Sequence, residues 1–189
     1  VRKCSKKSGD PYARFPFDPH FTEKINTGIF SYDPAFGISD SASYNALLAM
    51  AEYDNRYYIL YIWYGHWKNK DRIKNFKDSK GMFYSFEYHC ETAFSQLTVI
   101  NDLLEKLNID FIPFDPKGKG TRMNHLFSNQ SDAAKKAKIY DAFDSVVDDG
   151  RLYVMDNPGL DEFEREFKNF PDLVKFDLID AGANGLFIL

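Results

Sequence analysis

The chain has 189 residues, a mass of 21.9 kDa, a formal net charge of −4 and aromatic side chains at 17% of its positions. This length suits one well-buried domain, and the longest apolar runs are too short for a membrane-spanning helix, which needs about 20 residues. Cys4 and Cys90 exclude a disulfide framework and lack the spacing of a zinc site, as is typical of a reduced, intracellular protein.

The first half of the chain is dominated by strand patterns. Residues 1–26 are rich in proline, phenylalanine and charge, and they predict a linker or docking arm ahead of one domain over residues 27–189. Residues 28–35 form a first predicted strand that stops at Asp33-Pro34, because proline cannot donate to a β-ladder. Two further strands, over residues 44–53 and 56–63, form a predicted hairpin around Asp54-Asn55.

In the second half, helix patterns alternate with shorter strands. After a basic stretch over residues 66–80, the sequence predicts a strand, a helix, a strand, a basic loop, a helix, a strand and two helices. Their ranges are 81–88, 92–107, 109–114, 115–130, 131–147, 151–155, 160–170 and 175–189. A meander of three strands followed by alternating helices and strands predicts an α/β fold with a central mixed β-sheet flanked by helices.

Acidic residues recur at the predicted ends of these elements. Phe30-Ser31-Tyr32-Asp33 and Tyr84-Ser85-Phe86-Glu87 share one pattern, in which the serine and the acid lie on the same face of a strand. Asp177 and Asp180 lie three apart on one face of the last predicted helix. Because carboxylates held close together repel, they need a cation or a shared proton. Two strands and a helix that carry such acids predict a magnesium or manganese nuclease.

Four segments resemble the motifs of one family. They are Asp33-Pro34-Ala35 with Asp40 downstream, the strand ending in Glu87, the basic helix and Gly-Arg strand over residues 138–154, and Asp177-Leu178-Ile179-Asp180-Ala181. In this order they resemble the ribonuclease-H-like fold, and within it the C-terminal nuclease domain of viral large terminases, the DNA-packaging motor subunits. Three features depart from the family pattern. Phe176 replaces an acid or histidine, residues 117–130 form an insertion, and no phosphate-binding loop of an ATPase is present.

The resemblance implies a metal-dependent endonuclease that cuts concatemeric double-stranded DNA by two-metal hydrolysis. Asp33 would bridge two Mg²⁺ or Mn²⁺ ions, Glu87 would hold one ion and Asp180 the other, with Asp177 as a ligand or as an orienting residue. The implied partners are an ATPase domain missing from this chain, the portal and a small terminase subunit. The implied location is the cytoplasm of the infected host cell.

Six basic residues are candidates for DNA phosphate contacts, although solvated basic surfaces give the same pattern. They are Lys117, Lys119, Arg122, Lys135, Lys136 and Lys138. Two other functions remain open at this point. A Holliday-junction resolvase or transposase-type nuclease has the same fold and prefers branched DNA. A non-catalytic packaging-motor docking module would bind no divalent ion.

Overall fold

A single sheet organises the part of the chain that the computed structural model describes, namely residues 12–16, 18–25, 27–35, 42–91, 106–114 and 132–189. Its strands are β1 (Ala13–Phe15), β2 (Ile29–Asp33), β3 (Asn45–Tyr53), β4 (Arg56–Gly65), β5 (Glu87–Glu91), β6 (Phe111–Phe114) and β7 (Leu152–Met155). The seven strands lie in the order β1-β7-β4-β3-β2-β5-β6. The pairs β2–β3 and β3–β4 are antiparallel and all other neighbours are parallel, so the sheet is mixed.

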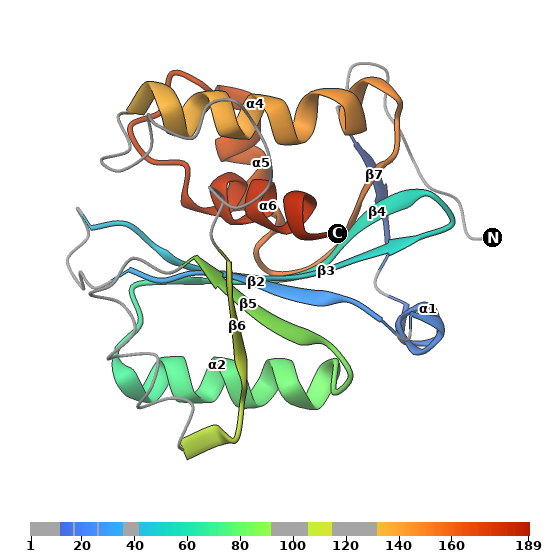
Figure 1. Cartoon of the computed structure of the whole chain (residues 1–189), viewed down its shortest axis with the longest axis vertical. Helices are drawn as coiled ribbons and strands as arrows, with labels where there is room; N and C mark the ends of the chain where they lie inside the picture. Colours follow the sequence, from blue (N-terminus) through green and yellow to red (C-terminus); the bar gives the residue numbers. More distant parts are fainter. Residues whose placement is uncertain (1–11, 17, 26, 36–41, 92–105, 115–131) are drawn as a thin grey trace.

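Helices cover both faces of this sheet. They are α1 (Pro19–Lys24), α2 (Asn69–Met82), α4 (Asp132–Asp148), α5 (Leu160–Asn169) and α6 (Asp177–Ile188). Figure 1 shows α4, α5 and α6 on one face and α2 on the other. A mixed sheet between helical layers is the α/β architecture that the sequence predicted, so the fold class is confirmed.

The run Ala46–Ala51 near the start of β3 shows why this sheet has two buried faces. Leu48 and Met50 belong to the apolar cluster beneath α4, α5 and α6, whereas Leu47 and Ala49 belong to the cluster beneath α2. Because side chains alternate along a strand, a run that is apolar at every position is buried on both sides. The β3–β4 hairpin is confirmed, and its turn residues Asp54 and Asn55 have φ of 53° and 57°, which suits a two-residue hairpin turn.

Two parts of the prediction differ from the structure. The strand expected over residues 81–88 begins only at Glu87, because α2 continues to Met82 and a turn follows in which Phe86 N donates to the Phe83 carbonyl (3.2 Å). The expected N-terminal arm contributes α1 and also β1, which pairs in parallel with β7. None of the helices in the described ranges combines the length and apolar character that a membrane crossing requires.

Candidate active site

Asp33 is the last residue of β2, and the chain on both sides of it is anchored by the buried Arg72 of α2. One Arg72 Nη atom donates to the Ala35 carbonyl (3.0 Å) and to Asn45 Oδ1 (3.1 Å), and Nε donates to the Tyr32 hydroxyl (3.1 Å). Asn45 Oδ1 also accepts from the Ala35 N–H (3.2 Å). Because one guanidinium group holds the residues before and after Asp33, the backbone that carries this carboxylate is fixed.

The helix α6 lies directly on β2 because small residues face the strand. The Ser31 hydroxyl donates to the Ala181 carbonyl (2.7 Å), and a Cβ atom added at Gly185 would lie only 2.3 Å from Met50 Sδ. Side chains two apart on a strand share a face, so Asp33 projects on the same side as Ser31, toward α6. The close helix therefore brings its first turn to the carboxyl end of β2.

Asp180, in that first turn, is buried between two lysines of α4. Lys135 Nζ lies 2.7 Å from one carboxylate oxygen and Lys138 Nζ lies 2.6 Å from the other. Burial alone lowers the pKa of Lys135, but the negative charges of Asp180 and Asp33 outweigh this effect and raise the pKa above its usual value. Asp180 and Asp33, which are far apart in the sequence, therefore act on the same ammonium group.

Asp177 is equally buried but is used differently. Its Oδ2 accepts a hydrogen bond from the backbone N–H of Tyr44 at 2.7 Å, which ties the start of α6 to the start of β3. A carboxylate that accepts a backbone N–H is held in one orientation. This contact favours a supporting position for Asp177 and leaves Asp180 facing the lysines.

Glu87 does not lie where the sequence predicted. It begins β5 instead of ending a strand, and it pairs with Ile29, at the opposite end of β2 from Asp33. The two positions are four residue steps apart along β2, which corresponds to about 13 Å. The Glu87 side chain is 68% exposed and lies 3.6 Å from His89 Nε2. The prediction that Glu87 and Asp33 flank one metal site is therefore wrong.

Glu91 takes the place that was expected for Glu87. It is the last residue of β5, and because Tyr32 pairs with Cys90 in parallel, the next step of the register brings Glu91 beside Asp33. The Glu91 side chain lies outside the described residues. Ligands of open α/β sheets bind at the carboxyl ends of the strands. By its backbone position at the end of β5, Glu91 is therefore a candidate ligand.

The basic residues proposed for DNA contact fall into three groups. Lys138 is buried, and its Nζ donates to Asn184 Oδ1 (2.9 Å) as well as pairing with Asp180, so the prediction of a phosphate contact is wrong for this residue. Lys135 faces the carboxylates in the same way, with its ammonium group 5.2 Å from the Phe176 ring centre. Lys136 is half-buried. Lys117, Lys119 and Arg122 lie outside the described residues.

The donor atoms at this position fit a hard divalent cation, although within the described ranges no three acidic, histidine or cysteine side chains form a complete metal-binding group. The ammonium group of Lys135 is paired with Asp180, and the charges of Asp180 and Asp33 raise its pKa. This position therefore favours a bound positive charge. Asp180 Oδ1 is buried and lies 2.6 Å from Lys138 Nζ, so positive charge balances this carboxylate inside the fold. Oxygen donors of this kind are those that Mg²⁺ and Mn²⁺ prefer.

Glu166, which is absent from the residues predicted for the site, holds the N-terminus of α6. Its Oε2 accepts hydrogen bonds from the backbone N–H groups of Leu178 (2.8 Å) and Ile179 (3.0 Å), and the side chain is fully buried. Burial raises the pKa of Glu166 to about 8 despite these two hydrogen bonds. The signal was available, because Glu166 lies three residues after Phe163 on the buried side of an amphipathic helix.

Glu166 is expected to make the fold less stable as pH rises. Its carboxyl group titrates near 4.5 in an unfolded chain and near 8 in the fold. Between these values the native state binds the extra proton, so the free energy of unfolding falls by up to about 1.4 kcal/mol per pH unit and levels off above them. Urea unfolding from pH 5 to 8 should show a smaller decline for Glu166→Gln, which keeps an acceptor for α6. Equal declines in the two proteins would show that Glu166 is already ionised in the fold.

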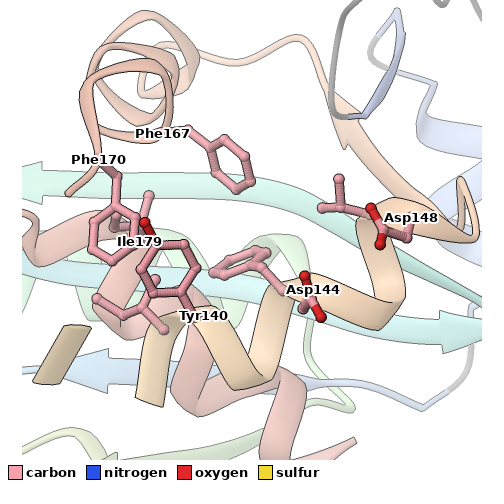
Figure 2. Close-up of a pocket in the computed structure, with 9 residues that line it drawn as sticks. Tyr140, Asp144, Asp148, Phe167, Phe170 and Ile179 are labelled. Atoms are coloured by element: carbon pink, nitrogen blue, oxygen red, sulfur yellow. The ribbon is translucent and has the colours of Figure 1, made fainter. Parts of the chain in front are cut away.

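The other face of α4 borders an apolar groove of about 230 Å³ (Figure 2). Tyr140 and Phe170 pack edge to face across it with ring centres 4.9 Å apart, Ile179 forms part of its floor, and Asp144 and Asp148 lie on the α4 side. The two carboxylates beside the groove, Asp144 and Asp148, are exposed, whereas Asp180 is buried between two lysines on the opposite side of α4. The candidate active site therefore lies on the lysine side of α4.

Comparison with solved structures shows this fold in viral terminase nuclease domains. The human cytomegalovirus terminase nuclease domain, manganese-soaked and inhibitor-bound, matches over 93% of this chain and 89% of its own, with a TM-score of 0.58 and 13% identity. The zinc-bound large terminase nuclease from thermophilic phage G20c matches over 84% of this chain and 79% of its own, with a TM-score of 0.52 and 13% identity. A large terminase from another thermophilic bacteriophage matches over 93% of this chain but 42% of its own, with a TM-score of 0.59 and 12% identity.

These matches confirm the resemblance to terminase nuclease domains and the ribonuclease-H-like fold. No protein-family model matches the chain, and no curated protein sequence matches it significantly. At 12–13% identity, the structural match shows a shared fold alone, and a function has to be argued from the site itself.

Proposed function

We propose that this domain is the metal-dependent endonuclease of a viral DNA-packaging terminase, and that it cleaves concatemeric double-stranded DNA with two Mg²⁺ or Mn²⁺ ions. The observation that carries the proposal is geometric: Asp33 ends β2 on the face that α6 covers, and the first turn of α6 places the buried Asp180 there, paired with Lys135 at 2.7 Å. This arrangement lies in a fold shared with terminase nuclease domains that were solved with manganese, zinc or magnesium.

Asp33, Asp180 and Glu91 would hold the ions at the carboxyl ends of β2 and β5. Bound divalent ions supply an activated water and stabilise the charge on the leaving oxygen of a phosphodiester. The chain's own residues fix the geometry around them. Arg72 holds the backbone beside Asp33, and Asp177 ties α6 to β3 through the Tyr44 N–H. The Lys138 side chain is buried beside Asp180, so its ammonium group would stay in place when ions bind and would balance part of the carboxylate charge.

The packaging context adds further parts to the proposal. Double-stranded DNA would be the substrate, with Lys136 and the basic residues Lys117, Lys119 and Arg122 as its phosphate contacts. An ATPase domain, the portal and a small terminase subunit would be the partners, in the cytoplasm of the infected host cell. The match to less than half of a phage large terminase supports a nuclease domain that works beside other domains.

A cleavage assay tests the proposed activity. Purified protein is incubated with supercoiled plasmid in manganese, in magnesium and in chelator, with a branched-junction oligonucleotide as a parallel substrate. We expect nicked and linear plasmid with either metal and none with chelator. Cutting restricted to the junction would favour a resolvase, and a folded protein that neither cuts nor binds manganese would favour a non-catalytic docking role.

Asp33→Ala is expected to reduce cutting to the chelator background while the melting temperature stays close to that of the wild type. The carboxylate is needed for metal binding, but its removal relieves repulsion with Asp180 and leaves Lys135 still paired. Asp144→Ala, which removes an exposed acid on α4, is the matched control and should cut normally. Near-normal cutting by Asp33→Ala would remove this residue from the mechanism.

A further inference from the structure

Tyr84 is the most exposed aromatic side chain among the described residues, at 87%, and it lies on a well-anchored turn. The turn is closed by the hydrogen bond from Phe86 N to the Phe83 carbonyl. Phe83 and Phe86 are buried on either side, and their ring centres lie 5.0 Å apart. The two buried rings anchor the turn, so Tyr84 projects outward from a fixed base.

The surface beside Tyr84 is a cationic groove of about 380 Å³ between the end of α2 and residues 106–109. Phe76, Leu107 and Ile109 contribute apolar surface to it, and its charged lining residues are Lys77, Lys80 and Lys106. Lys80 Nζ donates to the carbonyls of Leu107 (3.3 Å) and Asn108 (3.0 Å), which fixes one wall of the groove. The nearby Asp78 is paired with Lys74 at 3.3 Å, so it does not cancel the groove lysines.

This groove is separate from the candidate active site. It is built on the end of α2, on the sheet face opposite α4 and α6 (Figure 1). The turn that carries Tyr84 leads into Glu87, at the end of β2 farthest from Asp33. DNA seated at Asp33 and Asp180 would leave this groove free.

We infer that the groove binds unpaired, single-stranded DNA, with a base stacked on Tyr84 and phosphates at Lys77 and Lys106. A flat aromatic ring among lysines is the combination that single-strand-binding proteins use, because every base presents a face for stacking. Bases inside a duplex are already stacked on one another and offer no free face to a tyrosine. The inference rests on the proposed function only in taking DNA as the nucleic acid.

The test is fluorescence anisotropy with a labelled 12-nucleotide oligo(dT) and, in parallel, a 12-base-pair duplex, both in chelator so that nothing is cut. Tyr84→Ala should weaken oligo(dT) binding roughly fivefold or more, whereas Tyr84→Phe should bind like the wild type. Lys77→Ala should also flatten the dependence of affinity on salt, by about 0.7 in the log–log slope. Tyr53→Ala, which removes a 47% exposed tyrosine between Glu52 and Asp54, is the control and should change nothing.

Binding of oligo(dT) by Tyr84→Ala at wild-type strength would overturn the inference, as would an equal loss for the duplex. The side chains of Tyr84, Lys77 and Tyr53 are all exposed, so each variant should melt close to the wild-type temperature. The plasmid assay separates the two proposals. If the protein cuts plasmid but does not bind oligo(dT), the single-strand groove alone is refuted. If it binds oligo(dT) in a Tyr84-dependent way but does not cut plasmid, the proposed function alone is refuted.

Discussion

Glu91→Gln is expected to abolish metal-dependent DNA cleavage, whereas the same change at Glu87 leaves cleavage near the wild-type rate. Glu91 ends β5 next to Asp33 in the strand register, and Glu87 begins β5 next to Ile29. Loss of a metal ligand should lower the cleavage rate at least about 100-fold, because loss of a residue that only supports a ligand lowers activity by up to about 100-fold. Rates measured at saturating manganese would compare the two variants directly.

The pair is informative because the substitutions are chemically identical and lie on the same strand. Manganese affinity, measured by calorimetry without DNA, should fall for Glu91→Gln and stay unchanged for Glu87→Gln. If Glu87→Gln were the inactive variant, the second ligand would have to reach Asp33 across about 13 Å, and the register of β2 and β5 would be in doubt.

The error over Glu87 has a local cause. Phe30-Ser31-Tyr32-Asp33 and Tyr84-Ser85-Phe86-Glu87 have the same order of residue types, but only the first is a strand. The second segment lies at a turn in which Phe83 and Phe86, three positions apart, are both buried. Both belong to the same apolar cluster as Phe30 and Tyr32. Aromatic residues spaced by two or by three can both reach a core, so spacing alone did not distinguish a turn from a strand.

Other parts of the site followed from sequence because their causes are local. The small residues Ala181 and Gly182 directly after Asp180 are readable in the sequence as a face that can lie close to a sheet, and the contacts of Ala181 and Gly185 show this packing. The strand β1 was not predictable in the same way. It spans only Ala13–Phe15 and is held by β7, whose residues come about 140 positions later in the chain. The neighbouring Tyr12 is buried against Phe163 and Phe167 of α5, which is again a distant partner.

Asp180→Asn is expected to be more damaging than Asp177→Asn, in both activity and stability. An asparagine at position 177 can still accept the Tyr44 N–H, so cleavage should fall by only about 10- to 100-fold, as for a residue that orients a ligand. An asparagine at position 180 leaves the buried Lys138 ammonium without its carboxylate, which should cost about 3–5 kcal/mol of stability. Cleavage should then be absent at every manganese concentration.

A double variant separates lost chemistry from lost folding. Asp180→Asn combined with Lys138→Met also removes the buried ammonium group that Asp180→Asn leaves without a carboxylate. The urea unfolding midpoint of the double variant should therefore be higher than that of Asp180→Asn alone. Its cleavage should remain absent, because the metal-binding carboxylate is still missing. Recovery of cleavage together with stability would show that Asp180 serves folding only. Loss of cleavage in Asp177→Asn alone would instead make Asp177 the metal ligand, because its bond to Tyr44 would then be a secondary role.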